Sequence, residues 1–238
     1  MEHSILREWE QKNNIQLGIE KEKLLWEYAE LVYHANKRFN LAGLKTRHDI
    51  LINLVLGSIE PLLHLDVPRG TLFADIGTGA GIPGIPVAIY HDELAGVLID
   101  SNGKKISFVK KVIRDLLLDN VQPLQERIET AARTRLRNAF HIVFSRALGS
   151  ISVVAELAAP MLVSGGLLYV YSHERAEDLP APVAEHIGSL GMSALSIHKR
   201  ARYGLSDVNM VFIKTGATQD TFPRNMSAIK RDLNKFTS

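Results

Sequence analysis

The chain has 238 residues, of which 46% are hydrophobic and 23% charged, a composition that excludes a disordered or fibrous protein. The formal net charge is only +2, so attraction to nucleic acid would have to come from local basic patches. Cysteine is absent, which excludes disulfides, thiolate nucleophiles and cysteine-ligated zinc or iron–sulfur sites. No apolar run approaches the ~20 residues of a membrane span, and no signal-peptide core opens the sequence. We therefore expect a cytoplasmic protein with no membrane partner.

The first part of the chain is predicted to be a helical extension. Apolar residues recur at three- and four-residue steps across residues 20–39, which is typical of an amphipathic helix. A second helix is expected over residues 47–64, with Pro61 disturbing its last turn. The expected division is therefore an extension over residues 1–65 and a second domain over residues 66–238.

Beyond the extension, short apolar runs alternate with helical stretches. The expected strands are residues 71–77, 95–100, 121–125, 140–147 and 165–172, followed by an antiparallel pair at 193–200 and 209–214. The expected helices between them are residues 82–90, 104–118 and 151–163. This alternation predicts an α/β fold with a mostly parallel seven-stranded sheet covered on both faces.

A glycine-rich turn at residues 75–84 lies between the first expected strand and the first expected helix of the second domain. Glycines let backbone amides approach a ligand, and the helix N-terminus adds partial positive charge. Asp100 follows nineteen residues after Gly81, at the end of the second strand, where a carboxylate accepts hydrogen bonds from ribose hydroxyls. The turn and the acid together predict a nucleoside-containing cofactor.

Two cofactors fit this pattern. Residues 79–84 match the dinucleotide fingerprint G-x-G-x-x-G. Asp75, however, stands just before the glycines, where it would repel a pyrophosphate and suit a positively charged ligand. S-adenosylmethionine carries a sulfonium and an amino group but no phosphate, so it is favoured over NAD.

The same residues carry a family resemblance. The stretches FADIGTGAGIPGIPVAI, LIDSNGKKISFVKKV, QERIE and FSRA resemble the bacterial ribosomal RNA small subunit methyltransferase G family, also called glucose-inhibited division protein B. NKRFNLAGL (36–44) and FPRN (222–225) extend the resemblance toward both ends. It implies a Rossmann-like class I S-adenosylmethionine-dependent methyltransferase fold. It also implies methyl transfer to N7 of a guanine in small-subunit (16S) ribosomal RNA.

The resemblance further implies which residues bind the cofactor. The glycine turn would contribute Asp75, Gly77, Thr78, Gly79 and Ala80; Asp100 and Ser101 would hold the ribose; Arg127, Ile128 and Glu129 would lie along the adenine; and Arg146 would close the pocket. No catalytic residue and no metal site is assigned, and a monomer is expected.

Basic residues near both ends of the chain are expected to contact ribosomal RNA. They are Lys37, Arg38, Arg224, Lys230 and Arg231, which flank the expected mouth of the cofactor site. A basic run over residues 104–137 is equally compatible with a solvated helix face.

The chemistry implied by the resemblance agrees with the composition. Cytosine C5 methylation needs a cysteine nucleophile and radical methylation needs an iron–sulfur cluster, and neither is possible here. Guanine N7 already has a free lone pair, so catalysis reduces to holding the reacting atoms in line with water excluded.

Four positions depart from the family pattern. Leu54 and Gly57 stand where the family has His and Asp, His141 stands in place of an Asp, and Ser172 in place of a Lys. These polar losses leave open a methyltransferase of the same fold that acts on another RNA, a small molecule or a protein. A nucleotide-binding module without catalysis is the third possibility, because fold alone does not choose a function.

Overall fold

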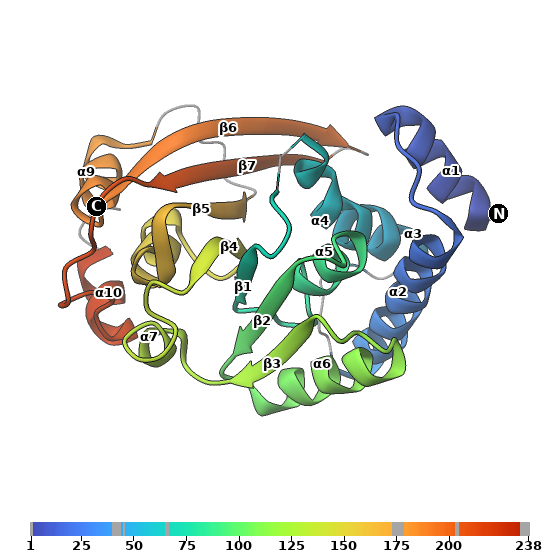
Figure 1. The fold of residues 1–238 in the computed structure, drawn as a ribbon, viewed down its shortest axis with the longest axis horizontal. Helices are drawn as coiled ribbons and strands as arrows, with labels where there is room; N and C mark the ends of the chain where they lie inside the picture. The colour runs from blue at the N-terminus through green and yellow to red at the C-terminus, as the bar shows by residue number, and fades with distance from the viewer. Residues whose placement is uncertain are drawn as a thin grey trace.

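The computed structural model describes residues 2–39, 44, 46–64, 67–172, 179–202 and 205–233 (Figure 1). Its N-terminal part is helical. The elements are α1 (Glu2–Asn13), α2 (Ile19–Phe39), α3 (Arg47–Asp49), η1 (Ile50–Leu56), α4 (Gly57–Ile59) and η2 (Glu60–His64). Helix α1 was not predicted.

The expected single helix over residues 47–64 has the right extent but the wrong geometry. Its central part, η1, is a wide π-helix, and its last part, η2, is a tight 3₁₀-helix that contains Pro61. Proline cannot donate the backbone hydrogen bond of an α-helix, and 3₁₀ turns commonly finish helices. π-Helical turns are rare and occur often at functional sites.

Seven strands form one sheet in the order β3-β2-β1-β4-β5-β7-β6, so the predicted fold class is confirmed. The strands are β1 (Leu72–Ile76), β2 (Ala95–Asp100), β3 (Val121–Gln125), β4 (Phe140–Arg146), β5 (Leu162–Ser172), β6 (Met192–Arg202) and β7 (Leu205–Lys214). β7 runs antiparallel to both β5 and β6, and the other pairings are parallel.

Helices cover both faces of the sheet (Figure 1). The N-terminal helices, α5 (Gly84–Tyr90) and α6 (Gly103–Asp115) pack on one face. The other face carries α7 (Ile128–Ala131), α8 (Ile151–Ala158), η3 (Ala159–Met161), α9 (Ala181–Ser189) and α10 (Met226–Leu233). Helices α7, α9 and α10 were not predicted.

Alternation along β1 shows how the strand serves two cores. Phe73 packs into a cluster with Tyr28 and Val55 of the N-terminal helices, whereas Ala74 faces Leu157 of α8. The helical extension therefore shares its core with one face of the sheet. Among the described residues, no helix combines the length and apolarity needed to cross a bilayer.

The sheet order also predicts where a ligand binds. β1 lies between β2 and β4, so the connections after these strands leave in opposite directions. In open α/β sheets, ligands bind in the crevice outside the carboxyl ends of the strands at such a switch point.

Candidate functional site

The glycine turn after β1 is shaped by a buried carboxylate. Oδ2 of Asp75 accepts hydrogen bonds from Thr78 Oγ1 (2.6 Å) and from the backbone N of Gly84 (2.9 Å). Gly84 lies so close to β2 that a Cβ atom there would be 2.2 Å from Leu98 Cδ2. Gly77 has φ +71°, and its missing Cβ would lie 2.5 Å from Leu148 Cδ1. The positive φ of Gly77 and the crowding around both residues favour glycine at these two positions.

Asp75 retains one unsatisfied oxygen. The residue is fully buried, and among the described residues its Oδ1 has no hydrogen-bond partner. Burial raises the pKa of Asp75 to about 7, against the opposing effect of its hydrogen bonds from Thr78 and Gly84. A buried carboxyl with an open oxygen favours a positive rather than a negative ligand group beside the turn.

Asp100 lies at the end of β2, beside the turn. Its Oδ2 accepts from the backbone N of Gly79 (3.1 Å) and its Oδ1 from the backbone N of Asn102 (2.8 Å), while Lys105 Nζ lies 3.7 Å from Oδ2. An ionised carboxylate offers about four acceptor positions. Asp100 is therefore held rigidly and still has capacity for two ribose hydroxyls.

A cavity of about 420 Å³ joins these elements at the carboxyl ends of the strands. It brings together six of the predicted cofactor residues: Gly77, Asp100, Ser101, Arg127, Ile128 and Glu129. It also contains five that were not predicted: Asn102, Lys105, Ala147, Leu148 and Met226. The acceptors of Asp100 and the apolar side chains suit the ribose and adenine of S-adenosylmethionine, so the residues present fit this cofactor.

The five cavity residues that were not predicted differ in whether the sequence could have indicated them. Asn102 and Lys105 directly follow Asp100, and Ala147 and Leu148 directly follow β4, so their strand-end positions were a usable signal. Met226 comes from α10, far along the chain, and nothing in its local sequence indicates the cavity.

The other five predicted cofactor residues do not line this cavity. Thr78 and Ala80 are buried, and the carbonyl of Ala80 accepts from Tyr28 Oη of α2 (2.9 Å). Asp75 lies buried behind the turn, and Gly79 contributes through its amide to Asp100. These contacts support the wall of the cavity. Direct cofactor contact by these residues stays a prediction.

Arg146, the fifth, leaves the end of β4 in the direction of the N-terminal helices. Its Nη2 donates to the carbonyl of Asn53 in η1 (2.9 Å), and its guanidinium lies 5.7 Å from the centre of the Tyr171 ring. Tyr171 in turn donates its hydroxyl to the carbonyl of Ser58 (2.6 Å). Arg146 therefore ties the carboxyl end of β4 to the helical extension.

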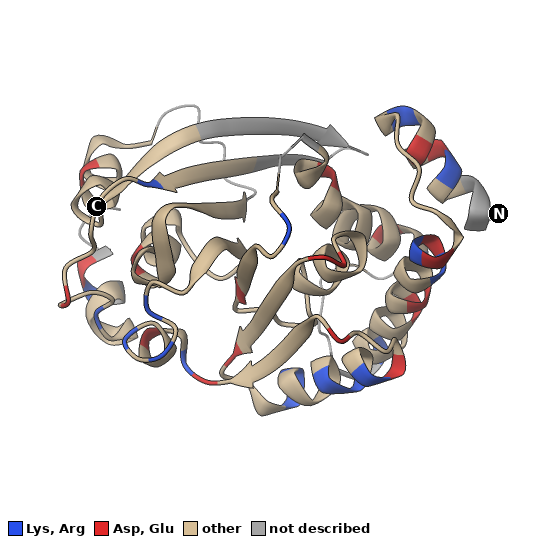
Figure 2. Cartoon of the chain, in the orientation of Figure 1, with Lys and Arg blue, Asp and Glu red and all other residues tan. Residues whose placement is uncertain are grey.

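The predicted RNA-binding cations have different surroundings. Lys37 is exposed on α2, with Nζ 4.4 Å from the centre of the Tyr33 ring, and Arg231 is exposed on α10. Arg224 instead forms ion pairs with Glu156 and Asp232. The side chains of Arg38 and Lys230 lie outside the described residues. Figure 2 shows further Lys and Arg residues gathered on α6.

A second cavity, of about 390 Å³, lies at the opposite end of the parallel strands. It is lined by residues 67–71, 141–142 and 163–167. This is the amino end of the parallel strands, where ligands of such sheets do not usually bind. Within the part of the chain that the structure describes, no three His, Asp or Glu side chains are grouped to hold a metal ion.

Comparisons with known proteins point to one family. The family model described as rRNA small subunit methyltransferase G matches residues 21–202. A protein of Mycoplasmoides gallisepticum named ribosomal RNA small subunit methyltransferase G is 31% identical over 211 residues, which is 87% of each chain. The protein of the same name from Moorella thermoacetica is 30% identical and covers 92% of this chain and 93% of its own.

Solved structures support the fold. A SAM-dependent methyltransferase from Aquifex aeolicus superposes with a TM-score of 0.50 at 16% identity, covering 66% of this chain and 89% of its own. Its strong sequence divergence limits that likeness to architecture. In this sheet, the cavity beside Gly77 and Asp100 lies at the switch point between β1 and β4, where the strand order reverses.

Proposed function

Because the chain belongs to the ribosomal RNA small subunit methyltransferase G family, we propose that it transfers a methyl group from S-adenosylmethionine to N7 of a guanine in 16S ribosomal RNA. The observation that carries the proposal is the cavity that joins the glycine turn to Asp100. The cofactor, when bound, supplies an electrophilic methyl group.

The residues of this chain would bind and orient. Asp100 and Ser101 would bind the ribose. The apolar side chains of Ile128, Leu148 and Met226 would contact the adenine. Guanine N7 needs no base to remove a proton, so alignment and exclusion of water supply the catalysis. This reaction explains why no catalytic acid or base is assigned.

We further propose that the protein acts as a monomer and needs no metal. A ribosomal RNA substrate would place the protein in the cytoplasm.

The test is methyl transfer from radiolabelled S-adenosylmethionine. The acceptors are 16S ribosomal RNA and 30S subunits from cells that lack the gene, and the labelled nucleoside is identified after digestion. The expected product is 7-methylguanosine. Label on another nucleoside, on protein or on a small molecule would instead support a methyltransferase of the same fold with a different substrate, which the departures at Leu54 and Gly57 keep open.

Asp100→Ala tests the site itself. Loss of two ribose hydrogen bonds to a charged acceptor costs about 1.5–3 kcal/mol each, so calorimetry should show S-adenosylmethionine bound about a hundredfold or more weakly. The matched control is Asp119→Ala, which removes an exposed carboxylate from the turn between α6 and β3. Unchanged affinity in Asp100→Ala, or binding of NAD by the wild type, would contradict the cofactor assignment.

A further inference from the structure

One residue of the cofactor cavity comes from a different part of the chain. Ten of its eleven lining residues lie between Gly77 and Leu148, and the eleventh is Met226, the first residue of α10. Helix α10 follows a loop, residues 215–225, that leaves β7 at the far side of the sheet (Figure 1). The position of Met226 therefore depends on what fixes this C-terminal segment.

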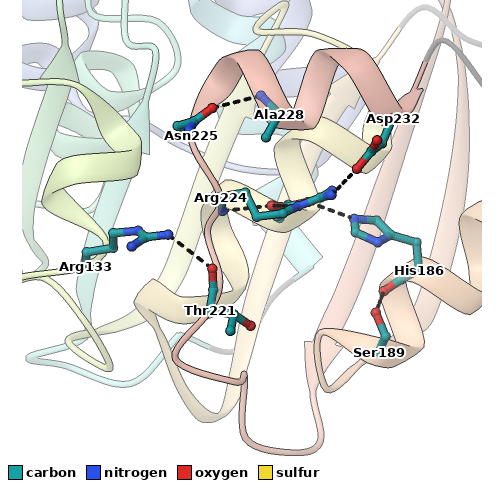
Figure 3. A network of polar contacts seen from close by, with 9 residues as sticks. Arg133, His186, Ser189, Thr221, Arg224, Asn225, Ala228 and Asp232 are labelled. Carbon is teal, nitrogen blue, oxygen red and sulfur yellow. Dashed lines mark hydrogen bonds and ion pairs between the residues drawn. The ribbon is translucent and has the colours of Figure 1, made fainter.

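An arginine two residues before Met226 anchors the segment to α8. Arg224 donates from Nε to Glu156 Oε1 (2.9 Å) and from Nη2 to Oε2 (2.7 Å), and its backbone N also donates to Oε1 (2.9 Å). Its Nη1 pairs with Asp232 on α10 (Figure 3). The contact is thus bidentate and fixes both the side chain and the backbone at residue 224.

The carboxylate that receives these bonds is buried. Glu156 is 0% exposed, and His186 Nε2 of α9 lies 3.3 Å from its Oε2. Burial alone would raise the pKa of Glu156, but hydrogen bonds from His186 and Arg224 outweigh it and lower the pKa to about 2. Glu156 is therefore ionised and paired at neutral pH.

A second anchor connects the loop to the adenine side of the cavity. Arg133 Nε donates to the carbonyl of Pro223 (2.7 Å), and Arg137 Nη1 donates to the carbonyl of Phe222 (2.9 Å). Both arginines follow α7, the helix that carries Ile128 and Glu129 of the cavity. The segment before Met226 is thus held from two sides, by α8 and by the residues after α7.

We propose that Arg224 and Glu156 are positioning residues for the cofactor: their ion pair sets Met226 against the part of the cavity that receives the adenine. The thioether of Met226 supplies an adaptable, polarisable contact to an aromatic face. This role differs from the phosphate contact expected of Arg224, since all of its guanidinium nitrogens face carboxylates of the protein itself. The inference rests on the proposed function, because it assigns S-adenosylmethionine to this cavity.

The test compares cofactor binding in three variants, measured by calorimetry well below the unfolding temperature. Glu156→Gln keeps the shape but removes the charge, Arg224→Lys keeps the charge but loses the bidentate geometry, and Met226→Ala removes the contact itself. Each should weaken S-adenosylmethionine about tenfold, the scale of losing roughly two buried methylenes. Arg7→Ala, which removes an exposed arginine of α1 outside the cavity lining, is the control and should bind S-adenosylmethionine as the wild type does.

Three readouts separate positioning from simple loss of stability. KM for S-adenosylmethionine should rise while kcat is retained. Glu156→Gln combined with Met226→Ala should be no worse than either alone, since both act through one contact. The salt dependence of RNA binding should be unchanged in Arg224→Gln, which removes the charge.

The outcomes are distinguishable. If the wild type binds no S-adenosylmethionine, the proposed function and this inference fail together. If the wild type binds but Met226→Ala and Glu156→Gln have wild-type affinity, only this inference is overturned. A lower RNA salt slope in Arg224→Gln with intact cofactor affinity would return Arg224 to the phosphate-contact role.

Discussion

Two buried carboxylates in this protein have opposite surroundings. Asp75, behind the glycine turn, and Glu156, beneath the C-terminal segment, are both 0% exposed. Asp75 accepts hydrogen bonds from a hydroxyl and a backbone amide, whereas Glu156 accepts from a guanidinium and lies against an imidazole. The pKa of Asp75 is raised to about 7 and that of Glu156 is lowered to about 2.

The difference shows that the charge of the partners, rather than burial, decides the ionisation of a buried acid. Glu156 is saturated by protein donors and serves to hold two elements together. Asp75 has one oxygen without a hydrogen-bond partner among the described residues, and it lies where a cationic ligand is expected. The partners of Glu156 hold two elements together, whereas those of Asp75 leave one oxygen for a ligand group, and each region can be tested by changing one residue.

The largest effect is expected from Arg224→Ala. The substitution leaves the Glu156 carboxylate buried without its guanidinium, and breaking a buried pair in this way costs about 3–5 kcal/mol. Because the Arg224 side chain is 32% exposed, we expect the lower end of that range for the loss in free energy of unfolding at neutral pH. Urea unfolding measures the change, and Arg231→Ala should stay within about 0.5 kcal/mol of the wild type.

The sign with pH follows from the lowered pKa of Glu156. Its stabilising effect is complete above the ordinary pKa of a glutamate and is lost as pH falls through about 2. The stability that this pair gives the wild type should therefore be constant from neutral pH down to about pH 5 and be lost only in acid. Without the guanidinium the pKa of Glu156 is higher than in the wild type, so the loss in Arg224→Ala should shrink as pH falls and the stranded carboxylate takes up a proton. A loss that stays the same into strong acid would contradict the pairing with Glu156.

Asp75→Asn should change the free energy of unfolding less than Arg224→Ala does. The pH dependence that it removes has the opposite sign to that of Glu156. The pKa of Asp75 is raised in the folded protein, so its protonated form is favoured there, and wild-type stability falls as pH rises through about 7. The amide cannot ionise, so the variant should lose this dependence. Between pH 5 and pH 8 we expect the stability difference between wild type and variant to change by about 2–3 kcal/mol.

The control for this measurement is Asp119→Asn, which removes an exposed carboxylate and should run parallel to the wild type. Parallel profiles for Asp75→Asn as well would mean that Asp75 is ionised throughout. S-adenosylmethionine sharpens the comparison: a positive group near Asp75 favours the charged form, so saturating cofactor should flatten the wild-type profile.

The two regions also differ in how far the sequence predicts them. The glycine turn and Asp100 lie close together in the chain, and their strand-end positions follow from the alternation of apolar runs. The ion pair of Arg224 joins residues 68 positions apart, and its carboxylate lies in α8, a helix with no other charged residue. Helix α7 has only four residues, too few for a periodic pattern. The glycine turn and Asp100 could therefore be predicted from neighbouring residues, whereas the ion pair between Arg224 and Glu156 could not.

The smallest effect is expected at Lys37, which completes the comparison with Arg224. Both cations were predicted to contact phosphate, but Lys37 is exposed and its Nζ lies over the Tyr33 ring rather than against a buried carboxylate. Its charge therefore remains available for a polyanion. Lys37→Ala should lower RNA affinity and reduce the slope of log K against log salt by about one, because each phosphate contact releases roughly one counterion.

The measurement is RNA binding at several salt concentrations, with Lys23→Ala as the control. Lys23 is exposed on the same helix, 3.9 Å from Glu27, so its removal changes the net charge equally at a place far from the end of α2. Cofactor affinity should be unchanged in both variants, because neither lysine lines the cavity. If both variants reduce the slope equally, the effect is one of net charge and Lys37 makes no phosphate contact of its own. A reduced slope in Lys37→Ala alone would assign the end of α2 to the RNA-binding surface.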